Sequence, residues 1–192
     1  MSQKKEILII DNRDSFTYNL YQLFDEHPLC NVHVQYSDEV NLDDLERYDQ
    51  LVISPGPDVP RAYPILFEIL ARYEHTKPIL GVCLGHQAIG EYYGANLYNV
   101  QHVFHGQARP LELLSPDLLF NNIENHTVVG LYHSWALAQD HFPSTLTVTA
   151  VSSDQIIMAF RHQTKNVRGI QFHPESYITQ KGRQMIANWI EQ

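Results

Sequence analysis

A cysteine between two glycines is the first feature of this sequence that could do chemistry. The segment 81–85, Gly-Val-Cys-Leu-Gly, has the form Gly-x-nucleophile-x-Gly and lies between a predicted strand and a predicted helix. A sharp turn at this point strains the central residue, exposes its side chain and lets neighbouring backbone pack against the glycines. The free N–H groups of the helix favour a thiolate at Cys83, and the Leu84 N–H would face a developing oxyanion. The alternative is a small buried core cysteine.

A histidine far along the chain is the candidate base. His173 ends a predicted strand, and Pro174 keeps its backbone extended. Side chains at positions i and i+2 of an extended segment lean to the same side, so Glu175 can contact the His173 ring and stabilise its imidazolium. The alternative is a strand-end histidine beside a solvated glutamate. Because Cys83 and His173 both follow strands at their carboxyl ends, where α/β sheets bind ligands, we interpret them as nucleophile and base.

The elements that must position these residues alternate in the first half of the chain. Apolar runs predict strands at 6–10, 32–36, 51–53 and 78–82, and helical spacing of apolar residues predicts helices at 16–24, 65–73 and 85–93. This order predicts right-handed crossovers and a mainly parallel sheet with helices on both faces. Ligand-binding residues are therefore expected directly after Ile10, Ile53, Val82 and Phe172.

The second half of the chain changes character. Strands are predicted at 127–131, 146–151, 155–161 and 168–172, and a last helix at 181–191. Short turns between these strands indicate antiparallel hairpins attached to the parallel core. The predicted fold class is thus α/β, an open, mainly parallel central sheet flanked by helices with an added antiparallel portion. Since no linker or repeat divides the 192 residues, we expect one domain over residues 1–192.

Charge and hydropathy exclude several classes of partner. Lys and Arg total 13 against 22 Asp and Glu, a formal charge of −9, so the chain is a poor candidate for binding nucleic acid or an anionic membrane. The apolar run 7–10 is too short for a signal sequence or a membrane span. Two cysteines do not make a disulfide framework, and Cys30 is interpreted as structural. A cytoplasmic protein is expected.

No cofactor or metal site is expected from the sequence. The phosphate-binding Gly-x-x-x-x-Gly-Lys-Ser/Thr loop does not occur, and Cys83 with His86 has no second ligand pair. His102 and His105 have no cysteine or carboxylate cluster nearby, so we expect them to be polar surface residues.

Four segments together resemble the class I, or triad-type, glutamine amidotransferases. They are 10–17 (Ile-Asp-Asn-Arg-Asp-Ser-Phe-Thr), 54–57 (Ser-Pro-Gly-Pro), 81–87 (Gly-Val-Cys-Leu-Gly-His-Gln) and 172–176 (Phe-His-Pro-Glu-Ser). The chain is most similar to the small subunits of anthranilate synthase and 4-amino-4-deoxychorismate synthase. The resemblance runs nearly end to end and implies a flavodoxin-like core.

The resemblance also implies roles for individual residues. Cys83 would attack the side-chain amide of L-glutamine, release ammonia and form a glutamyl thioester, with His173 as base and Glu175 as its orienter. The Gly56 and Leu84 N–H groups would form the oxyanion hole. The implied substrate-binding residues, each of which could instead be a loop or packing residue, are Gly56, Pro57, Asp58, Leu84, Gln87, Ser134 and Trp135.

Three positions depart from the family pattern. Asp58 stands where the family usually has the second glycine of Pro-Gly-Pro-Gly, and its bulk and charge are expected to weaken glutamine binding. Gln107 replaces a common lysine and Trp135 a common leucine. These two are expected to affect the loop that faces a partner subunit.

A partner is implied by the resemblance. A chorismate-binding synthase subunit would receive the ammonia within a hetero-oligomer and make anthranilate or 4-amino-4-deoxychorismate. Two alternatives stay open: a stand-alone cysteine amidase or γ-glutamyl hydrolase on the same fold, and a non-catalytic binding module.

Overall fold

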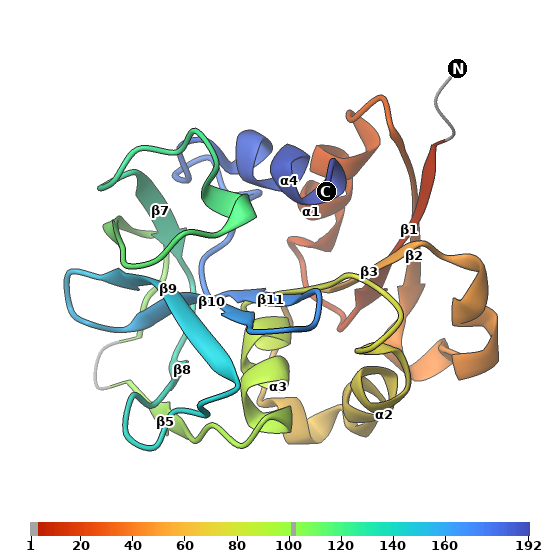
Figure 1. Cartoon of the computed structure of the whole chain (residues 1–192), viewed down its shortest axis with the longest axis horizontal. Coiled ribbons are helices and arrows are strands. Elements are labelled where there is room, and N and C mark those ends of the chain that lie inside the picture. Colours follow the sequence, from red (N-terminus) through yellow and green to blue (C-terminus); the bar gives the residue numbers. More distant parts are fainter. Residues whose placement is uncertain (1–3, 101–102) are drawn as a thin grey trace.

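A nine-stranded sheet forms the centre of the molecule, in the order β2-β1-β3-β4-β11-β10-β9-β6-β7 (Figure 1). The structure, a computed structural model, describes residues 4–100 and 103–192. The parallel half consists of β2 (Cys30–Tyr36), β1 (Lys5–Asp11), β3 (Gln50–Ile53), β4 (Ile79–Val82) and β11 (Val167–Ile170). The antiparallel half consists of β10 (Ile157–His162), β9 (Leu146–Ser152), β6 (Gln107–Leu113) and β7 (Val128–Leu131).

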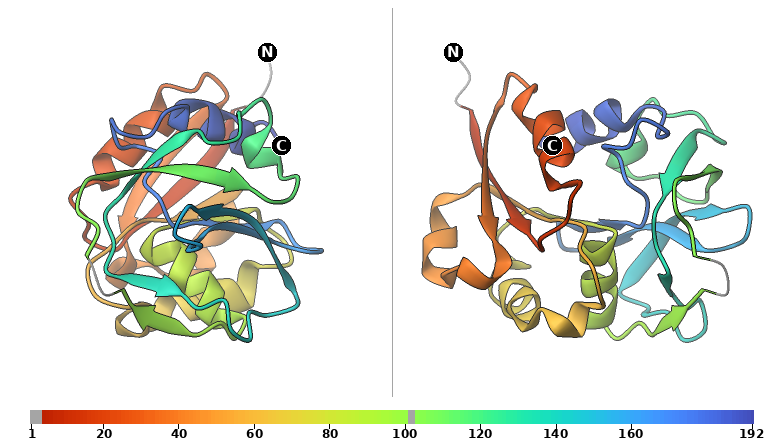
Figure 2. Two further views of the ribbon diagram at one scale, coloured as in Figure 1. Left: turned by 90° about the vertical axis from the view of Figure 1, so that its left-hand side faces the viewer. Right: turned by 180° about the vertical axis from the view of Figure 1, so that it is seen from behind.

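Helices cover both faces of the parallel half (Figures 1 and 2). On one face lie α1 (Thr17–Asp25) and α4 (Gly182–Ile190), and on the other lie α2 (Pro64–Tyr73) and α3 (Leu84–Tyr92). The predicted α/β class, with helices on both faces, is confirmed.

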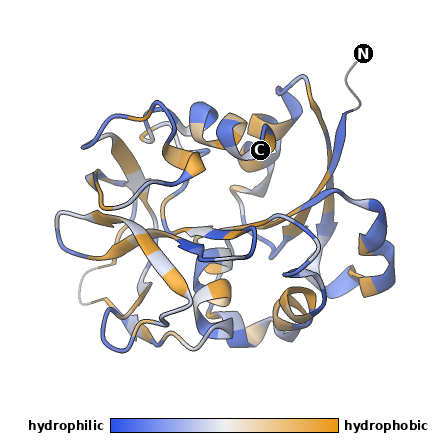
Figure 3. Cartoon of the chain, viewed as in Figure 1, coloured by the Kyte–Doolittle hydropathy of each residue, from blue (hydrophilic) through white to orange (hydrophobic). Residues whose placement is uncertain are grey.

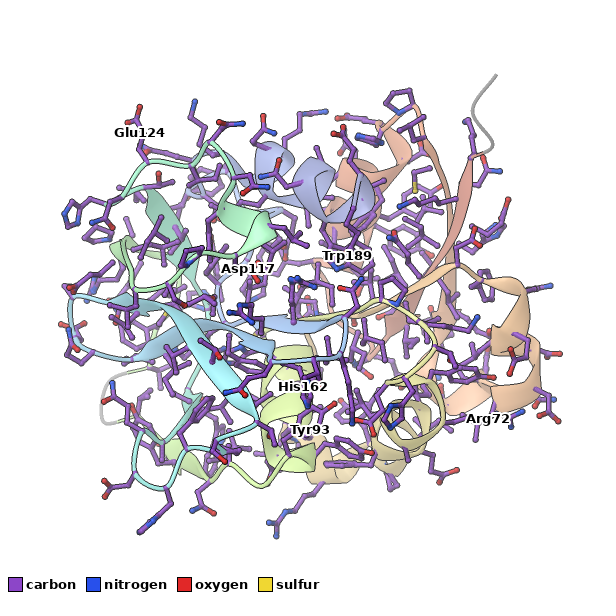
Figure 4. The ribbon with its side chains drawn as sticks, in the orientation of Figure 1. Arg72, Tyr93, Asp117, Glu124, His162 and Trp189 are labelled. Carbon is purple, nitrogen blue, oxygen red and sulfur yellow. The ribbon has the colours of Figure 1, made fainter. Side chains whose placement is uncertain are left out.

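The strand β1 shows why its sequence is so densely apolar. Ile7 and Ile9 belong to the core cluster shared with α1 and α4, while Leu8 and Ile10 belong to the cluster shared with α2. Both faces of the strand are buried, so apolar residues occupy successive positions instead of alternating ones. Apolar residues accordingly line the sheet in Figure 3. In Figure 4, Trp189 lies on the inner side of α4, and its buried ring packs edge-on against the ring of Phe24 on α1.

The antiparallel half is larger than the sequence predicted. The strand β6 was not expected, and it changes partner along its length: residues 107–110 pair with β7 and residues 111–113 pair with β9. A separate two-stranded sheet joins β5 (Leu97–Asn99) to β8 (Trp135–Leu137), and neither strand was expected. Short 3-10 helices at Ser37–Glu39, Leu42–Arg47, Pro60–Ala62 and Leu118–Phe120 complete the described elements.

The strand β11 corrects one detail of the sequence prediction. It is antiparallel to β10, as a hairpin strand should be, but it also lies parallel to β4, with Ile170 opposite Val82. β11 is therefore the point at which the parallel and antiparallel halves meet. The residues that follow β4 and β11 consequently emerge side by side at one edge of the sheet.

No helix within residues 4–100 and 103–192 has both the length and the apolar character needed to cross a bilayer.

Candidate active site

The turn after β4 holds Cys83 in an unusual backbone conformation. Its φ is 51° and its ψ is −101°, a region that residues with a side chain rarely adopt. The Cys83 N–H donates to the Ile170 carbonyl oxygen at 2.8 Å, and α3 begins at Leu84. The strained strand-to-helix turn expected from the sequence is therefore present, and its hydrogen bond ties Cys83 to β11.

The two glycines of this turn are required by close backbone contact. A Cβ atom on Gly81 would lie 2.4 Å from the Gly85 carbonyl oxygen. A Cβ on Gly85 would lie 2.3 Å from the Ile53 carbonyl oxygen at the end of β3. The first turn of α3 thus packs directly onto the sheet, and this close packing fixes the position of Cys83.

His173 and Glu175 form a buried pair beside Cys83. The His173 Nδ1 atom lies 2.6 Å from Glu175 Oε1, and the two side chains are 2% and 0% exposed. Within the described residues the other ring nitrogen, Nε2, has no hydrogen-bond partner. Burial opposes the charged form of the ring, but the Glu175 carboxylate and the neighbouring Cys83 sulfur outweigh it, so the pKa of His173 is raised well above its usual value. The structure thus brings the three predicted residues together.

Aromatic rings fix the position of the His173 side chain. Tyr132 and Phe16 contact it edge-on, with ring centroids 5.1 and 5.5 Å away. The Tyr132 hydroxyl lies 2.9 Å from Ser176 Oγ, and Thr179 Oγ1 donates to the His173 carbonyl oxygen at 2.6 Å. These contacts leave the imidazole little freedom to move away from Cys83.

A cavity of about 420 Å³ opens next to Cys83. Its walls come from the turns after β1, β3 and β4 and from the segment leading into β8: Arg13, Asp14, Ser15, Gly56, Pro57, Asp58, Cys83, Gln87, Tyr132, His133, Ser134 and Trp135. Six of the seven residues predicted to bind substrate line this cavity. The exception is Leu84, whose side chain is buried. It packs closely against Gly56, since a Cβ atom added to Gly56 would lie 2.6 Å from Leu84 Cδ2.

The three departures from the family pattern lie in different surroundings. Asp58 is exposed at the cavity with φ 69°, and its carboxylate accepts a hydrogen bond from the Val59 N–H at 2.8 Å. The carbonyl oxygen of Trp135, on β8, accepts from Gln87 Nε2 at 2.8 Å. Gln107 begins β6, where its side-chain oxygen accepts from Arg109. Only the first two contribute to the cavity wall.

Several residues at the site were not singled out individually by the sequence. Asp14 and His133 line the cavity, and Gln171 lies 3.6 Å from the Cys83 sulfur through its Nε2 atom. Burial raises the pKa of Asp14, against a hydrogen bond from the Phe16 N–H. Burial lowers the pKa of His133 to about 3, so this ring is neutral near pH 7. The expectation that ligand-binding residues follow Ile10 includes Asp14. His133 lies directly before Ser134 in the segment that resembles the family, but neither it nor Gln171 was given a role.

Potential metal ligands are dispersed in the part of the chain that the structure describes. No three His, Cys, Asp or Glu side chains gather there as a metal ion would require. His105 is exposed, as expected, and His102 lies outside the described residues.

The fold and the surroundings of Cys83 are those of an α/β protein that could use a cysteine nucleophile on an amide. The chain matches the family "Glutamine amidotransferase class-I" over residues 8–192. It is 39% identical over 194 residues to "Anthranilate synthase component 2" of Pseudomonas aeruginosa, covering 97% of this chain and 95% of the relative. It is 39% identical over 186 residues to "Aminodeoxychorismate synthase component 2" of Escherichia coli K12, covering 96% and 98%.

A solved structure of a Thermoplasma acidophilum protein shares the fold. It superimposes with a TM-score of 0.89 at 23% identity, covering all of this chain and 94% of the other. The family itself is shown by the match over residues 8–192 and by the two relatives at 39% identity. The chain belongs to the class I glutamine amidotransferases.

Proposed function

We propose that the chain hydrolyses L-glutamine through a thioester on Cys83. The Cys83 sulfur attacks the side-chain amide carbon, a C–S bond forms, and the C–N bond breaks as ammonia leaves with a proton from His173. Water then attacks the thioester while His173 takes its proton; the C–S bond breaks and the electron pair returns to sulfur. Glu175 holds the ring so that Nε2 faces the reacting atoms.

The His173–Glu175 contact carries this proposal. Since Nδ1 is engaged by Glu175, the second ring nitrogen is left buried, beside the cysteine and without another partner in the described residues. A buried polar atom without a partner is costly, and a role in proton transfer explains why it is there. The raised pKa of His173 supports a protonated ring in the resting site, ready to donate to departing ammonia.

The cavity supports glutamine as the occupant. We place the developing oxyanion at the N–H groups of Gly56 and Leu84, which the contact between Gly56 and the Leu84 side chain holds close together. The α-amino and α-carboxylate ends of glutamine then lie against Ser134 and Trp135. The rest of the binding site is formed by Pro57, Asp58 and Gln87.

We further propose that the ammonia passes to a separate chorismate-using synthase subunit. The two curated relatives are named as second components of anthranilate synthase and of aminodeoxychorismate synthase, and each is covered over nearly its whole length. The product is accordingly anthranilate or 4-amino-4-deoxychorismate. Reconstitution with each candidate synthase from the same organism, scored by the product formed, identifies which partner this chain serves.

The test of the chemistry is Cys83→Ser in the reconstituted complex. Glutamine-dependent product should fall by about 10³-fold or more, while synthesis from added ammonia continues at the wild-type rate. Cys30→Ala is the matched control, because Cys30 is buried elsewhere, and it should retain both activities. Loss of both activities in an assembled Cys83→Ser complex would make Cys83 structural.

The same preparation decides between this function and the alternatives. A glutamine-like electrophile should form a covalent adduct at Cys83 located by mass spectrometry; an adduct at Cys30 instead, or none, favours a non-catalytic binding module. Hydrolysis of peptides or poly-γ-glutamate without a partner would identify a stand-alone amidase.

A further inference from the structure

The side chain of Gln171 lies within hydrogen-bond distance of the cysteine sulfur. Gln171 lies between β11 and His173, is fully buried, and donates its backbone N–H to the Met158 carbonyl oxygen at 2.8 Å. Its side-chain Nε2 atom lies 3.6 Å from Cys83 Sγ. This separation suits a hydrogen bond to sulfur, whose radius is larger than that of oxygen. The side chain comes from the same segment as the proposed base but approaches the nucleophile independently of it.

The neighbouring hydrogen bonds decide which end of the Gln171 amide faces the sulfur. The Trp135 carbonyl oxygen can only accept, so the atom of Gln87 that lies 2.8 Å from it must be the Nε2 donor. That same nitrogen lies 3.1 Å from the Gln171 side-chain oxygen, which accepts from it. A reversed Gln171 amide would set two NH2 groups against each other. In this network the side-chain oxygen of Gln171 therefore faces Gln87, and its side-chain nitrogen faces the Cys83 sulfur.

We propose that Gln171 is a further catalytic residue, whose side-chain N–H donates to the Cys83 sulfur and stabilises its thiolate. This deepens the proposed glutaminase function and rests on it. The hydrogen bond favours the charged nucleophile before attack and stabilises the same charge when the thioester breaks. Gln87 orients the Gln171 amide and also donates a hydrogen bond to the Trp135 carbonyl oxygen. The two glutamine side chains therefore connect the wall of the cavity to the Cys83 sulfur.

The test measures how fast iodoacetamide alkylates Cys83 as pH rises, with neither glutamine nor a partner present. Gln171→Met keeps an unbranched side chain of similar length but lacks the donor, and Gln171→Glu keeps the oxygen that Gln87 contacts. In Gln171→Met the midpoint of the profile should move up by about one pH unit, which is a tenfold smaller thiolate fraction below the midpoint; in Gln171→Glu it should move up further, because a carboxylate also repels the thiolate. Burial raises the pKa of Cys30 to about 12, so this second thiol does not react in the range measured.

Gln50→Met is the matched control. Gln50 is also a buried glutamine, 2% exposed. It lies at the amino end of β3, whereas Cys83 follows the carboxyl end of the neighbouring parallel strand β4. Its substitution should leave the alkylation midpoint at the wild-type value. An unchanged midpoint in Gln171→Met would overturn the proposal and reduce Gln171 to a packing residue.

A measurement on the wild-type side chain covers the case in which the variants fail to fold. The NH2 resonances of Gln171 should shift with pH at the same midpoint as the alkylation rate, and Cys83→Ala should abolish that shift. Resonances that do not respond overturn the proposal. All these readouts are independent of glutamine turnover, so a chain that passes them but never forms a thioester refutes the proposed function and not the hydrogen bond.

Discussion

Glu175 is the carboxylate on which the charge of His173 depends. We expect Glu175→Gln to lower kcat/KM for glutamine by about 10²–10⁴-fold, because the ring loses the negative charge that stabilises its protonated form, even though the amide oxygen can still accept from Nδ1. The pKa of His173 falls in the variant, so the basic limb of the pH–rate profile moves to lower pH. The control is Glu124→Gln, at an exposed glutamate in the loop before β7 (Figure 4), and it should change neither quantity.

The same pair also affects stability. The folded pKa of His173 lies above its unfolded value near 6.5, so the protonated ring stabilises the fold fully below about pH 6.5 and loses this contribution as pH rises through the folded pKa. In Glu175→Gln this loss occurs at lower pH. NMR titration of the His173 ring measures the folded pKa directly, and an identical midpoint in wild type and variant contradicts the account.

Asp58 places a negative charge beside the proposed site of a substrate that carries its own carboxylate. Its φ of 69° is one that glycine adopts freely, so Asp58→Gly should keep the turn and lower the glutaminase KM about 3- to 10-fold. Asp58→Asn separates charge from bulk, because asparagine tolerates the same backbone conformation. If charge is the cause, both variants lower KM; an unchanged KM in both rules out the predicted weakening by Asp58.

At the scale of elements, the packing of α3 onto β3 fixes the position of Cys83. We expect Gly85→Ala to lower the free energy of unfolding by about 3 kcal/mol or more, because its Cβ meets the Ile53 carbonyl oxygen at 2.3 Å, and to displace Cys83 with loss of activity. Gly94→Ala provides the comparison. Its φ is 99° and no atom lies within 4 Å of the added Cβ, so only backbone strain of about 1–2 kcal/mol is expected, with activity kept. Urea denaturation measures both, and equal losses would contradict the packing argument.

The sequence predicted elements whose signal is local and missed those whose signal is not. β1 contains an unbroken apolar run and α4 has apolar residues at helical spacing, and both elements form where expected. β6 contains Pro110, which argues against a strand because it cannot donate to a ladder. The chain tolerates this proline because the pairing with β7 ends there and the pairing with β9 begins at Leu111. β5 and β8 are three residues each, too short to show any period.

The site divides in the same way. Cys83 and His173 stand beside glycine or proline at strand ends, so local chemistry marks them. Gln171 and His133 resemble ordinary polar residues in the sequence, and their importance comes only from what the fold places against them. Gln171 comes within hydrogen-bond distance of the Cys83 sulfur because β11 pairs with β4. A single sequence contains no sign of that strand pairing.

For the molecule as a whole, buried neutral histidines predict sensitivity to acid. Burial lowers the pKa of His86 to about 3, whereas the unfolded chain binds that proton near pH 6.5. The stability contributed by the neutral ring is present above pH 6.5 and is lost as pH falls toward 3. Between pH 7 and pH 5 the loss is about 2 kcal/mol.

The variant His86→Leu should remove that part of the pH dependence. The fall in unfolding free energy between pH 7 and pH 5 should be about 2 kcal/mol smaller than in wild type, whatever the variant's stability at pH 7. His105→Leu, at an exposed position, is the control and should keep the wild-type pH dependence. An unchanged dependence in His86→Leu would mean that the ring is solvated at low pH without unfolding.

The insertion of β11 between β4 and β10 bears on the order in which the protein is made. Cys83 and Gln171 are 88 residues apart, and the position that β11 fills between β4 and β10 stays vacant until residues 167–170 have been synthesised. A nascent chain that lacks these residues therefore carries the Cys83 thiol with neither His173 nor Gln171 beside it. Cys83 can therefore meet its proposed base and its proposed hydrogen-bond donor only after residues 167–173 have been synthesised and β11 has paired with β4.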